Sequence, residues 1–437
     1  MNRRTLLHTT AGLIATAVAE NCWAVQVPEP KTESFRFRPW RGPTMGQVIC
    51  VTPTGGNFVH TYYDVCPFSP SQRYVAATRL PFQDRRPVLG ETADVCVIDL
   101  EERTIRMVYT TRSWGFQTGA NLHWGATDGH LYCNDVIGDQ AVCVGIDLQT
   151  GRIRAYAGPM YDIAPDESCV IGFPLELLDI TQHGYGVPAP DPQHPRQLPP
   201  GASEGEGIWR TDLNTNAKTL LISLAIAATK LPEPPPQRAA TFYFWHSKFN
   251  KQGTRIMQVL RCLFPDGSGG RNVNVLTFNV DGSDVRRTQS FPVWGHGGGH
   301  PNWHPDGEHL IRNLKPGGSK KDRLCKIPAD GSDITVLSDT IDGGGHPTIE
   351  PAERYIITDT HTVESELQCV KIRLIDLKQQ TELALCEIPT IDRRSLSQTV
   401  LRLDGHPAWS RNYKKVLFQA APEGRRQLLL GDLEGVI

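Results

Sequence analysis

The chain lacks the features that mark several common functional classes. Its 437 residues carry 45 Lys and Arg against 47 Asp and Glu, which leaves a formal net charge of −2. Proteins that bind nucleic acid or a membrane surface need a large basic excess, so neither partner is expected. After the N-terminus no segment approaches the ~20 consecutive apolar residues that a membrane-spanning helix requires. We therefore expect no membrane insertion.

Paired cysteines and helical periodicity are also scarce. The 11 cysteines are scattered singly, with no C-x-x-C pair, so most are interpreted as small buried apolar residues. One or two disulfides remain possible in an exported protein, but the sequence does not say which cysteines would pair. Only residues 220–231 have a convincing helical pattern. Against this, 40 Gly and 33 Pro separate short apolar runs, which predicts an all-β fold rich in turns.

The first residues have the pattern of an export signal. Arg3 and Arg4 precede a weakly apolar run from Ala11 to Ala19, with small residues suited to cleavage up to Ala24. The arginine pair fits a twin-arginine signal, although an ordinary secretory signal with two arginines is the alternative. Residues 1–24 are thus predicted to be a signal peptide, and the mature protein to be periplasmic or secreted.

One short phrase recurs along the chain at intervals of about 45 to 60 residues. Its clearest copies begin at His300, His346 and His406, each followed by Pro and then by a strand-like run after a turn. A period of this length suits four short strands, which make one blade of a β-propeller. Weaker copies complete a set of seven and begin at Val65, Asn121, Tyr161 and His246.

These seven copies predict a single seven-bladed β-propeller domain over residues 25–437, which we expect to be a monomer. Residues 46–51 precede the first copy, so they could pair with the last blade and close the ring.

The repeat places histidines at one equivalent position in four successive blades. In a propeller the innermost strands line the central channel, so His246, His300, His346 and His406 are predicted to point toward one face of it. Converging imidazoles make a plausible site for a divalent ion such as zinc, with manganese or calcium as alternatives. The rival interpretation is that His-Pro only fixes how each strand begins. Additional candidate ligands are His361, His296, His304 and Cys325.

A second group of candidates lies in the N-terminal half and rests on resemblance. The runs beginning at Tyr62, Asn121, Gly184 and His246 together resemble the seven-bladed ulvan lyases. The later blades more distantly resemble the propeller oligogalacturonate lyases. The likeness covers most of residues 40–430, although no single motif is diagnostic.

The resemblance implies a set of roles for individual residues. Ulvan lyases cleave a sulfated polysaccharide beside uronic acid by β-elimination, with a His and a Tyr for proton transfer and an Arg that neutralises the carboxylate. By position these roles fall on His123, Tyr185 and Arg210, with Tyr243 as a helper, while Asn121 and His246 would bind substrate. The chain departs from the family where a second His is expected, since residues 141–145 contain none.

The chemistry explains why such residues are needed. The proton beside a uronate carboxylate becomes acidic enough to remove only when that carboxylate is neutralised by arginine or a metal. We therefore expect a polysaccharide lyase that acts on an anionic, ulvan-like polymer. The alternatives are a metal-dependent oligogalacturonate lyase and a non-enzymatic periplasmic binding propeller, because propellers host all three.

Overall fold

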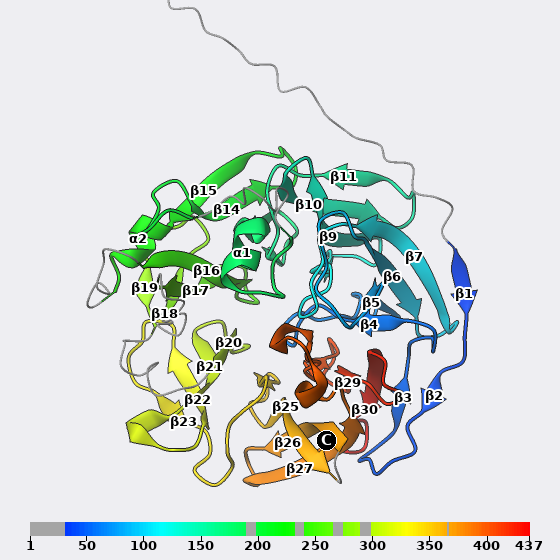
Figure 1. The fold of residues 1–437 in the computed structure, drawn as a ribbon. Helices are drawn as coiled ribbons and strands as arrows, with labels where there is room; N and C mark the ends of the chain where they lie inside the picture. The colour runs from blue at the N-terminus through cyan, green and yellow to red at the C-terminus, as the bar shows by residue number, and fades with distance from the viewer. Residues whose placement is uncertain (1–30, 189–197, 232–239, 265–273, 289–298, 365–366) are drawn as a thin grey trace, which may run out of the picture.

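The computed structural model describes residues 31–188, 198–231, 240–264, 274–288, 299–364 and 367–437. Within these residues the strands form seven small sheets arranged in a ring as a seven-bladed β-propeller, as the repeat predicts (Figure 1). The predicted signal peptide and His296 lie outside the described residues. The first strand of each repeat lies nearest the centre, and the later strands follow outward.

The first three blades are built from the N-terminal half, and each is an antiparallel sheet. Blade 1 contains β4 (Asn57–Val59), β5 (Tyr74–Leu80), β6 (Ala93–Asp99), β7 (Thr104–Thr111) and the added edge strand β1 (Thr32–Ser34). Blade 2 contains β8 (His123–Trp124), β9 (His130–Ile137), β10 (Gln140–Asp147) and β11 (Ile153–Ala155). Blade 3 contains β12 (Asp162–Ile163), β13 (Cys169–Gly172), β14 (Gly207–Asp212) and β15 (Lys218–Ser223).

The next three blades repeat the same order from the centre outward. Blade 4 contains β16 (Thr241–Phe249), β17 (Arg255–Leu263), β18 (Asn274–Asn279) and β19 (Arg286–Arg287). Blade 5 contains β20 (Gly299–Trp303), β21 (His309–Leu314), β22 (Arg323–Pro328) and β23 (Thr335–Val336). Blade 6 contains β24 (Thr348–Ile349), β25 (Tyr355–Glu364), β26 (Leu367–Asp376) and β27 (Thr381–Pro389).

The seventh blade joins the two ends of the described chain and so closes the ring. It contains β28 (Ala408–Trp409), β29 (Lys415–Ala420) and β30 (Gln427–Asp432), followed outward by β3 (Val48–Cys50) and β2 (Arg38–Pro39). Ile49 of β3 is paired with Leu430 of β30. The expectation that residues 46–51 close the ring is therefore confirmed, and the edge of β30 is covered.

In three of the seven blades, the tryptophan of the phrase connects the blade to the one before it. Trp303 Nε1 donates a hydrogen bond to the carbonyl of Lys248 in the preceding blade, at 2.9 Å. Trp124 Nε1 donates to the carbonyl of Pro67 at 2.9 Å, and Trp409 Nε1 to that of Thr348 at 3.5 Å. Because a buried indole N–H needs an acceptor, this bond explains why the phrase carries Trp three positions after its first residue.

The apolar core lies between the blades rather than in one central layer. Middle strands are buried on both faces, as in β30, where five consecutive residues from Gln427 are buried. Between blades 6 and 7, for example, Ile372 and Leu385 pack in one cluster with Phe418. This two-sided burial explains why the strands have continuous apolar runs instead of strict alternation.

The helix predicted over residues 220–231 is largely wrong. Residues up to Ser223 form β15, and only α2 (Leu224–Ala228) is helical, with the Ser223 hydroxyl accepting a hydrogen bond from Ile226 N. Ladder pairing with β14 outweighs the local helical preference of this stretch. The structure adds α1 (Leu175–Thr181) after β13. No helix in the described residues is long and apolar enough to span a membrane.

Candidate metal and active site on the propeller axis

Four histidines from successive blades gather at the centre of the ring. The ring centroids of His300 and His346 are 4.0 Å apart, and those of His346 and His406 are 4.4 Å apart. Tyr62 joins this group, because its ring centroid lies 4.5 Å from that of His406 and 5.3 Å from that of His246. The shared register of the four repeats thus brings the histidines to one place, which the sequence interpretation requires for a metal site.

Three of these histidines have an unusual backbone conformation. His246, His300 and His406 have φ values of 57°, 52° and 44°, and Asn121 at the equivalent position of blade 2 has 56°. A left-handed backbone is costly for residues other than Gly and Asn, by about 1–3 kcal/mol, and such residues cluster at functional sites. The repeated strain is consistent with a functional requirement for the direction in which these side chains leave the strands.

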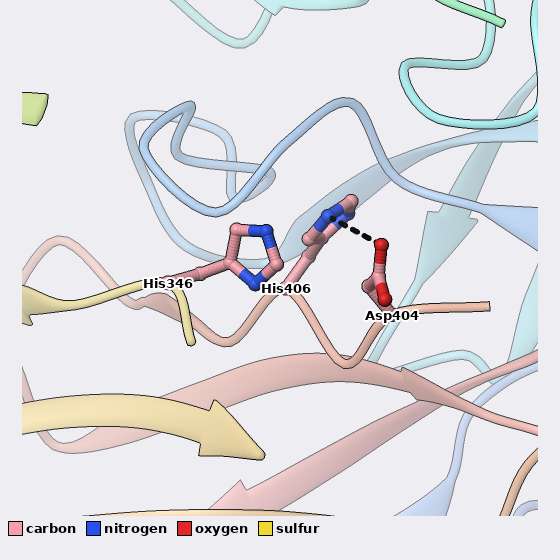
Figure 2. Close-up of side chains that lie close together, drawn as sticks. All are labelled: His346, Asp404 and His406. Carbon is pink, nitrogen blue, oxygen red and sulfur yellow. Dashed lines mark ion pairs between the residues drawn. The ribbon is translucent and has the colours of Figure 1, made fainter. Parts of the chain in front are cut away.

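His346, Asp404 and His406 form a compact triplet of possible metal ligands (Figure 2). One donor atom from each residue lies within 4.8 Å of the other two, and all three residues are buried. His406 Nε2 is 4.0 Å from Asp404 Oδ2. Within the described residues, the buried Nε2 atoms of His346 and His406 have no hydrogen-bond partner. Buried polar atoms are almost always paired, so these two nitrogens fit a bound cation.

The other nitrogens of the two histidines support this interpretation. His346 Nδ1 lies 2.8 Å from Asp359 Oδ1, a contact that leaves a lone pair on Nε2. This carboxylate–histidine arrangement is the usual support of a metal-binding imidazole. His406 Nδ1 lies 3.0 Å from the amide nitrogen of Gln419, whose Oε1 has no partner in the described residues. Rotating that amide by 180° gives His406 the same tautomer as His346.

The Asp404 carboxylate is held by positively charged neighbours. It accepts hydrogen bonds from Arg393 Nη2 at 2.6 Å and from Arg402 Nε at 2.7 Å, and His361 Nε2 lies at 2.9 Å. Burial opposes ionisation, but the hydrogen bond to His361 and the charge of Arg402 hold the pKa of Asp404 well below 3.8. Asp404 is therefore an anion. His361, which the sequence suggested as a metal ligand, is not part of the triplet and instead hydrogen-bonds to Asp404.

Burial keeps three of the axial imidazoles neutral, those of His246, His300 and His406. Loss of solvent lowers the pKa of His406 well below 6.5, and the neighbouring His346 lowers it further. The pKa values of His246 and His300 are lowered well below 6.5 by the same two causes, burial first and neighbouring charged groups second. Neutral imidazoles are the form that binds metals and accepts protons, so the cluster is suited to both tasks.

Tyr185 lies in this cluster beside two arginines that the sequence interpretation missed. Arg402 Nη2 donates a hydrogen bond to the Tyr185 hydroxyl at 3.3 Å, and the Tyr185 ring packs edge-on against Trp245. Arg261 lies 3.9 Å above the ring of the same Trp245 and donates to Gln182 Oε1 at 2.7 Å. The site thus contains a phenol, neutral imidazoles and guanidinium groups, which are the components that proton abstraction beside a carboxylate requires.

The structure does not bring the trio inferred from resemblance together. Arg210 lies on β14, the third strand of blade 3 from the axis, where it is 3.8 Å from Asp212. His123 lines a cavity that none of the four axial histidines lines. Tyr185 is the member of the trio whose ring contacts an axial histidine, with its centroid 6.1 Å from that of His246.

Three further residues proposed from the sequence, Tyr243, Asn121 and Cys325, are buried in the fold. Tyr243 is buried on β16, where its phenol interacts with Arg261. The Asn121 amide donates to the carbonyls of Met160 and Tyr161, at 2.9 and 3.2 Å. Cys325 is buried on β22, and burial raises the pKa of its thiol to about 11. Cys325 is not part of the axial triplet.

A second group of possible metal ligands, His304, Asp306 and Glu353, is already paired with a positively charged side chain. His304 lies within donor reach of Asp306 and Glu353. The ammonium group of Lys326 lies 3.4 Å from Asp306 and 3.1 Å from Glu353. Because this ammonium pairs with both carboxylates, we interpret the group as an ion-pair network between blades 5 and 6.

Only some of the site residues that the sequence interpretation missed could have been found from the sequence. Arg402 and Asp404 stand four and two positions before His406, so the run Arg-Leu-Asp-Gly-His could have been read as one functional segment. Asp359 lies in the middle of β25, and only the paired strands show that it meets His346. No feature of the sequence alone connects Arg261 with Tyr185.

Comparison with known proteins places the fold but not the family. No family model and no curated protein matches the sequence. Among solved structures, the chain is similar to an oligogalacturonate lyase from Vibrio parahaemolyticus, with 13% identity and a TM-score of 0.65 over 93% of this chain and 99% of that one. It is also similar to an oligogalacturonate lyase in complex with manganese, with 14% identity and a TM-score of 0.67 over 93% of this chain and 98% of that one. At such identity the likeness shows a shared seven-bladed propeller fold.

Proposed function

We propose that this protein is a metal-dependent lyase that cleaves uronate-containing saccharides by β-elimination. The observation that carries the proposal is the pair of buried, unpartnered Nε2 atoms of His346 and His406 beside the anionic Asp404. The Tyr185 hydroxyl, hydrogen-bonded to Arg402, lies in the same cluster. Two imidazoles and a carboxylate suit zinc or manganese, and a protein similar in fold is named as a complex with manganese.

The proposed reaction breaks one C–O bond and forms one C=C bond. A base removes the proton from C5 of the uronate, the electron pair forms the C4=C5 double bond, and the glycosidic oxygen leaves C4 and receives a proton. When bound, the divalent ion would neutralise the uronate carboxylate and make the C5 proton more acidic.

The residues of this chain supply the remaining requirements. We assign Arg402 as a second cation for the uronate carboxylate of the substrate. Its Nε holds Asp404 and its Nη2 donates to Tyr185, so the guanidinium lies between the candidate metal ligand and the candidate proton carrier. The Tyr185 phenol and the neutral imidazole of His246, whose ring centroids are 6.1 Å apart, are the proposed proton carriers. General acid and base groups of this kind contribute about 10²–10⁴ to a rate.

The preferred substrate in this proposal is a short galacturonate oligosaccharide. The two similar solved structures bear the name oligogalacturonate lyase, and Arg210, the arginine of the ulvan-type trio, lies on an outer strand away from Tyr185. Ulvan is the second candidate, because the N-terminal runs beginning at Tyr62 and Asn121 resemble that family. The twin-arginine-like residues at the N-terminus support export of the enzyme, and we propose a monomer as the acting form.

The decisive experiment is an activity screen with a matched inactive variant. Purified protein is incubated with galacturonate oligomers, polygalacturonate, ulvan, glucuronan and alginate, and the absorbance of the unsaturated uronate product is followed. Turnover of galacturonate oligomers that is lost with a chelator and in His406→Ala supports the proposal. Turnover of ulvan alone selects the second candidate, and no product from any substrate favours a binding propeller.

A further inference from the structure

A small closed loop of residues 115–119 lies in the connection between blades 1 and 2. Gly115 N donates a hydrogen bond to the Gly119 carbonyl at 3.0 Å, and Gly119 N donates to the Gly115 carbonyl at 2.9 Å. Gln117 lies at the tip of this loop and is 1% exposed. Because the two mutual hydrogen bonds fix the shape of the loop, they also fix where Gln117 enters the interior.

The backbone of Gln117 contacts the segment that carries Tyr185. Gln117 N donates to the carbonyl of Gly184 at 3.2 Å, in the peptide that precedes Tyr185. Gly184 has a φ of 87°, which favours glycine, and a Cβ atom there would lie only 2.1 Å from Val400 Cγ2. The segment that carries Tyr185 therefore packs directly against the segment that leads to Arg402.

The side chain of Gln117 holds that second segment. Its Nε2 donates to the carbonyls of Val400 and Arg402, each at 3.2 Å. Both neighbours of the amide are carbonyls, so the amide nitrogen rather than the oxygen must face them. Arg426, which is fully buried, donates from Nη2 to the same Arg402 carbonyl at 3.3 Å and also to the Leu401 carbonyl. These donors satisfy buried carbonyls that would otherwise lack a partner.

One residue thus holds both halves of the contact between Arg402 and Tyr185. The contact from Arg402 Nη2 to the Tyr185 hydroxyl is 3.3 Å long, which is near the upper limit for a hydrogen bond. A small shift of either segment would therefore break it. Gln117 is bonded to the peptides beside both residues, so it limits such shifts.

We propose that Gln117 is a positioning residue that sets the distance between Arg402 and Tyr185. It acts through these two side chains and does not touch the substrate. Its effect on turnover rests on the proposed lyase function, whereas its effect on the contact between Arg402 and Tyr185 does not.

The first test is steady-state kinetics of Gln117→Met, which keeps the length of the side chain but removes the amide. The value of kcat should fall roughly tenfold to a hundredfold, as expected when a reacting group is displaced by about 1 Å. Gln117→Asn keeps an amide that is one methylene shorter, and it should lower kcat in the same way. The control is Asn250→Leu, which removes a buried amide that donates to the Gly307 carbonyl between blades 4 and 5, and its kcat should be nearly unchanged.

A double-mutant cycle separates positioning from a general loss of structure. In the Arg402→Lys background, adding Gln117→Met should lower kcat by less than about twofold, because the guanidinium that Gln117 positions is already gone. An equal loss in both backgrounds would mean that Gln117 acts independently of Arg402, and the proposal would be wrong.

A crystal structure of Gln117→Met provides a readout that needs no activity. Arg402 Nη2 should lie more than roughly 3.5 Å from the Tyr185 hydroxyl, beyond hydrogen-bond distance. An intact contact, or an unchanged kcat in both Gln117 variants, would overturn the proposal. If the unmodified protein cleaves none of the uronate substrates, the proposed function is wrong, and the crystal structure alone then decides whether Gln117 holds the two residues together.

Discussion

Arg402 and Tyr185, which are 217 residues apart in the sequence, meet on the propeller axis, where Arg402 Nη2 donates to the Tyr185 hydroxyl at 3.3 Å. The same guanidinium holds Asp404 through its Nε at 2.7 Å. One side chain therefore connects a candidate metal ligand with a candidate proton carrier. A planar guanidinium can make both contacts at once, whereas an ammonium group acts as a single point charge.

This connection predicts the effect of three substitutions on turnover. Tyr185→Phe and Arg402→Lys should each lower kcat on the cleaved saccharide by about a hundredfold or more, because each removes a group that acts on the reacting atoms. Arg210→Ala should keep nearly full activity, since Arg210 lies on an outer strand beside Asp212. Steady-state kinetics measure all three. Inactive Arg210→Ala with active Tyr185→Phe would instead support the ulvan-type assignment.

Metal content is predicted to depend on the axial triplet alone. His346→Ala or His406→Ala should weaken binding of zinc or manganese at least tenfold, because each removes one of three donors. His304→Ala is the control. Its triplet with Asp306 and Glu353 already contains the Lys326 ammonium, so the bound metal should be unchanged. Elemental analysis of protein folded with excess metal provides the measurement, and a metal-free unmodified protein would contradict the proposal.

The fold could be predicted from the sequence because each blade needs similar contacts, and these contacts produce a recurring sequence pattern. Three of the seven copies, in blades 2, 5 and 7, carry an indole whose N–H reaches the preceding blade, as Trp303 reaches the carbonyl of Lys248. Each copy also needs a turn and a buried second strand. Closure by β3 was predictable for a related reason, since an open edge after β30 would be left unpaired.

The site was only partly predictable, because long-range contacts decide it. The histidines share one repeat position, so their convergence follows from the register. Asp359 and Arg261 lie on second strands, and their approach to His346 and Trp245 depends on strand lengths that the repeat does not set. Residues 220–231 show a local failure of another kind, since pairing of β15 with β14 overrides a helical pattern.

The indole contacts between blades should contribute measurably to stability. Trp303→Phe removes a buried hydrogen bond of 2.9 Å and leaves the Lys248 carbonyl without that donor. The expected loss is about 1–3 kcal/mol in the free energy of unfolding. Trp40→Phe is the control, because Trp40 Nε1 has no hydrogen-bond partner in the described residues, and it should cost less. Denaturant unfolding compares the two, and equal losses would show that indole volume rather than the hydrogen bond matters.

Asp162 predicts how stability changes with pH. Burial raises its pKa from 3.8 to about 7, although the backbone N–H groups of Phe249 and Ile163 partly oppose the rise. The folded protein therefore binds the Asp162 proton more tightly than the unfolded chain does. The contribution of Asp162 to the free energy of unfolding is therefore fully present below pH 3.8 and is lost as the pH rises toward 7.

The matching experiment compares unfolding free energies between pH 5 and 8. Relative to that of Asp162→Asn, the unfolding free energy of the unmodified protein should fall by about 1.4 kcal/mol per pH unit up to about pH 7 and then level off. The slope is smaller if the 21% exposure of the Asp162 side chain lets water solvate the anion. His123 does not interfere, because burial lowers its pKa to about 4 and keeps it neutral in this range. Asp281→Asn is the control, since hydrogen bonds from Ser283 lower the pKa of Asp281. The difference in unfolding free energy between that variant and the unmodified protein should stay constant between pH 5 and 8. A constant difference for Asp162→Asn as well would show that Asp162 is ionised throughout, with water or a cation reaching it in the cavity.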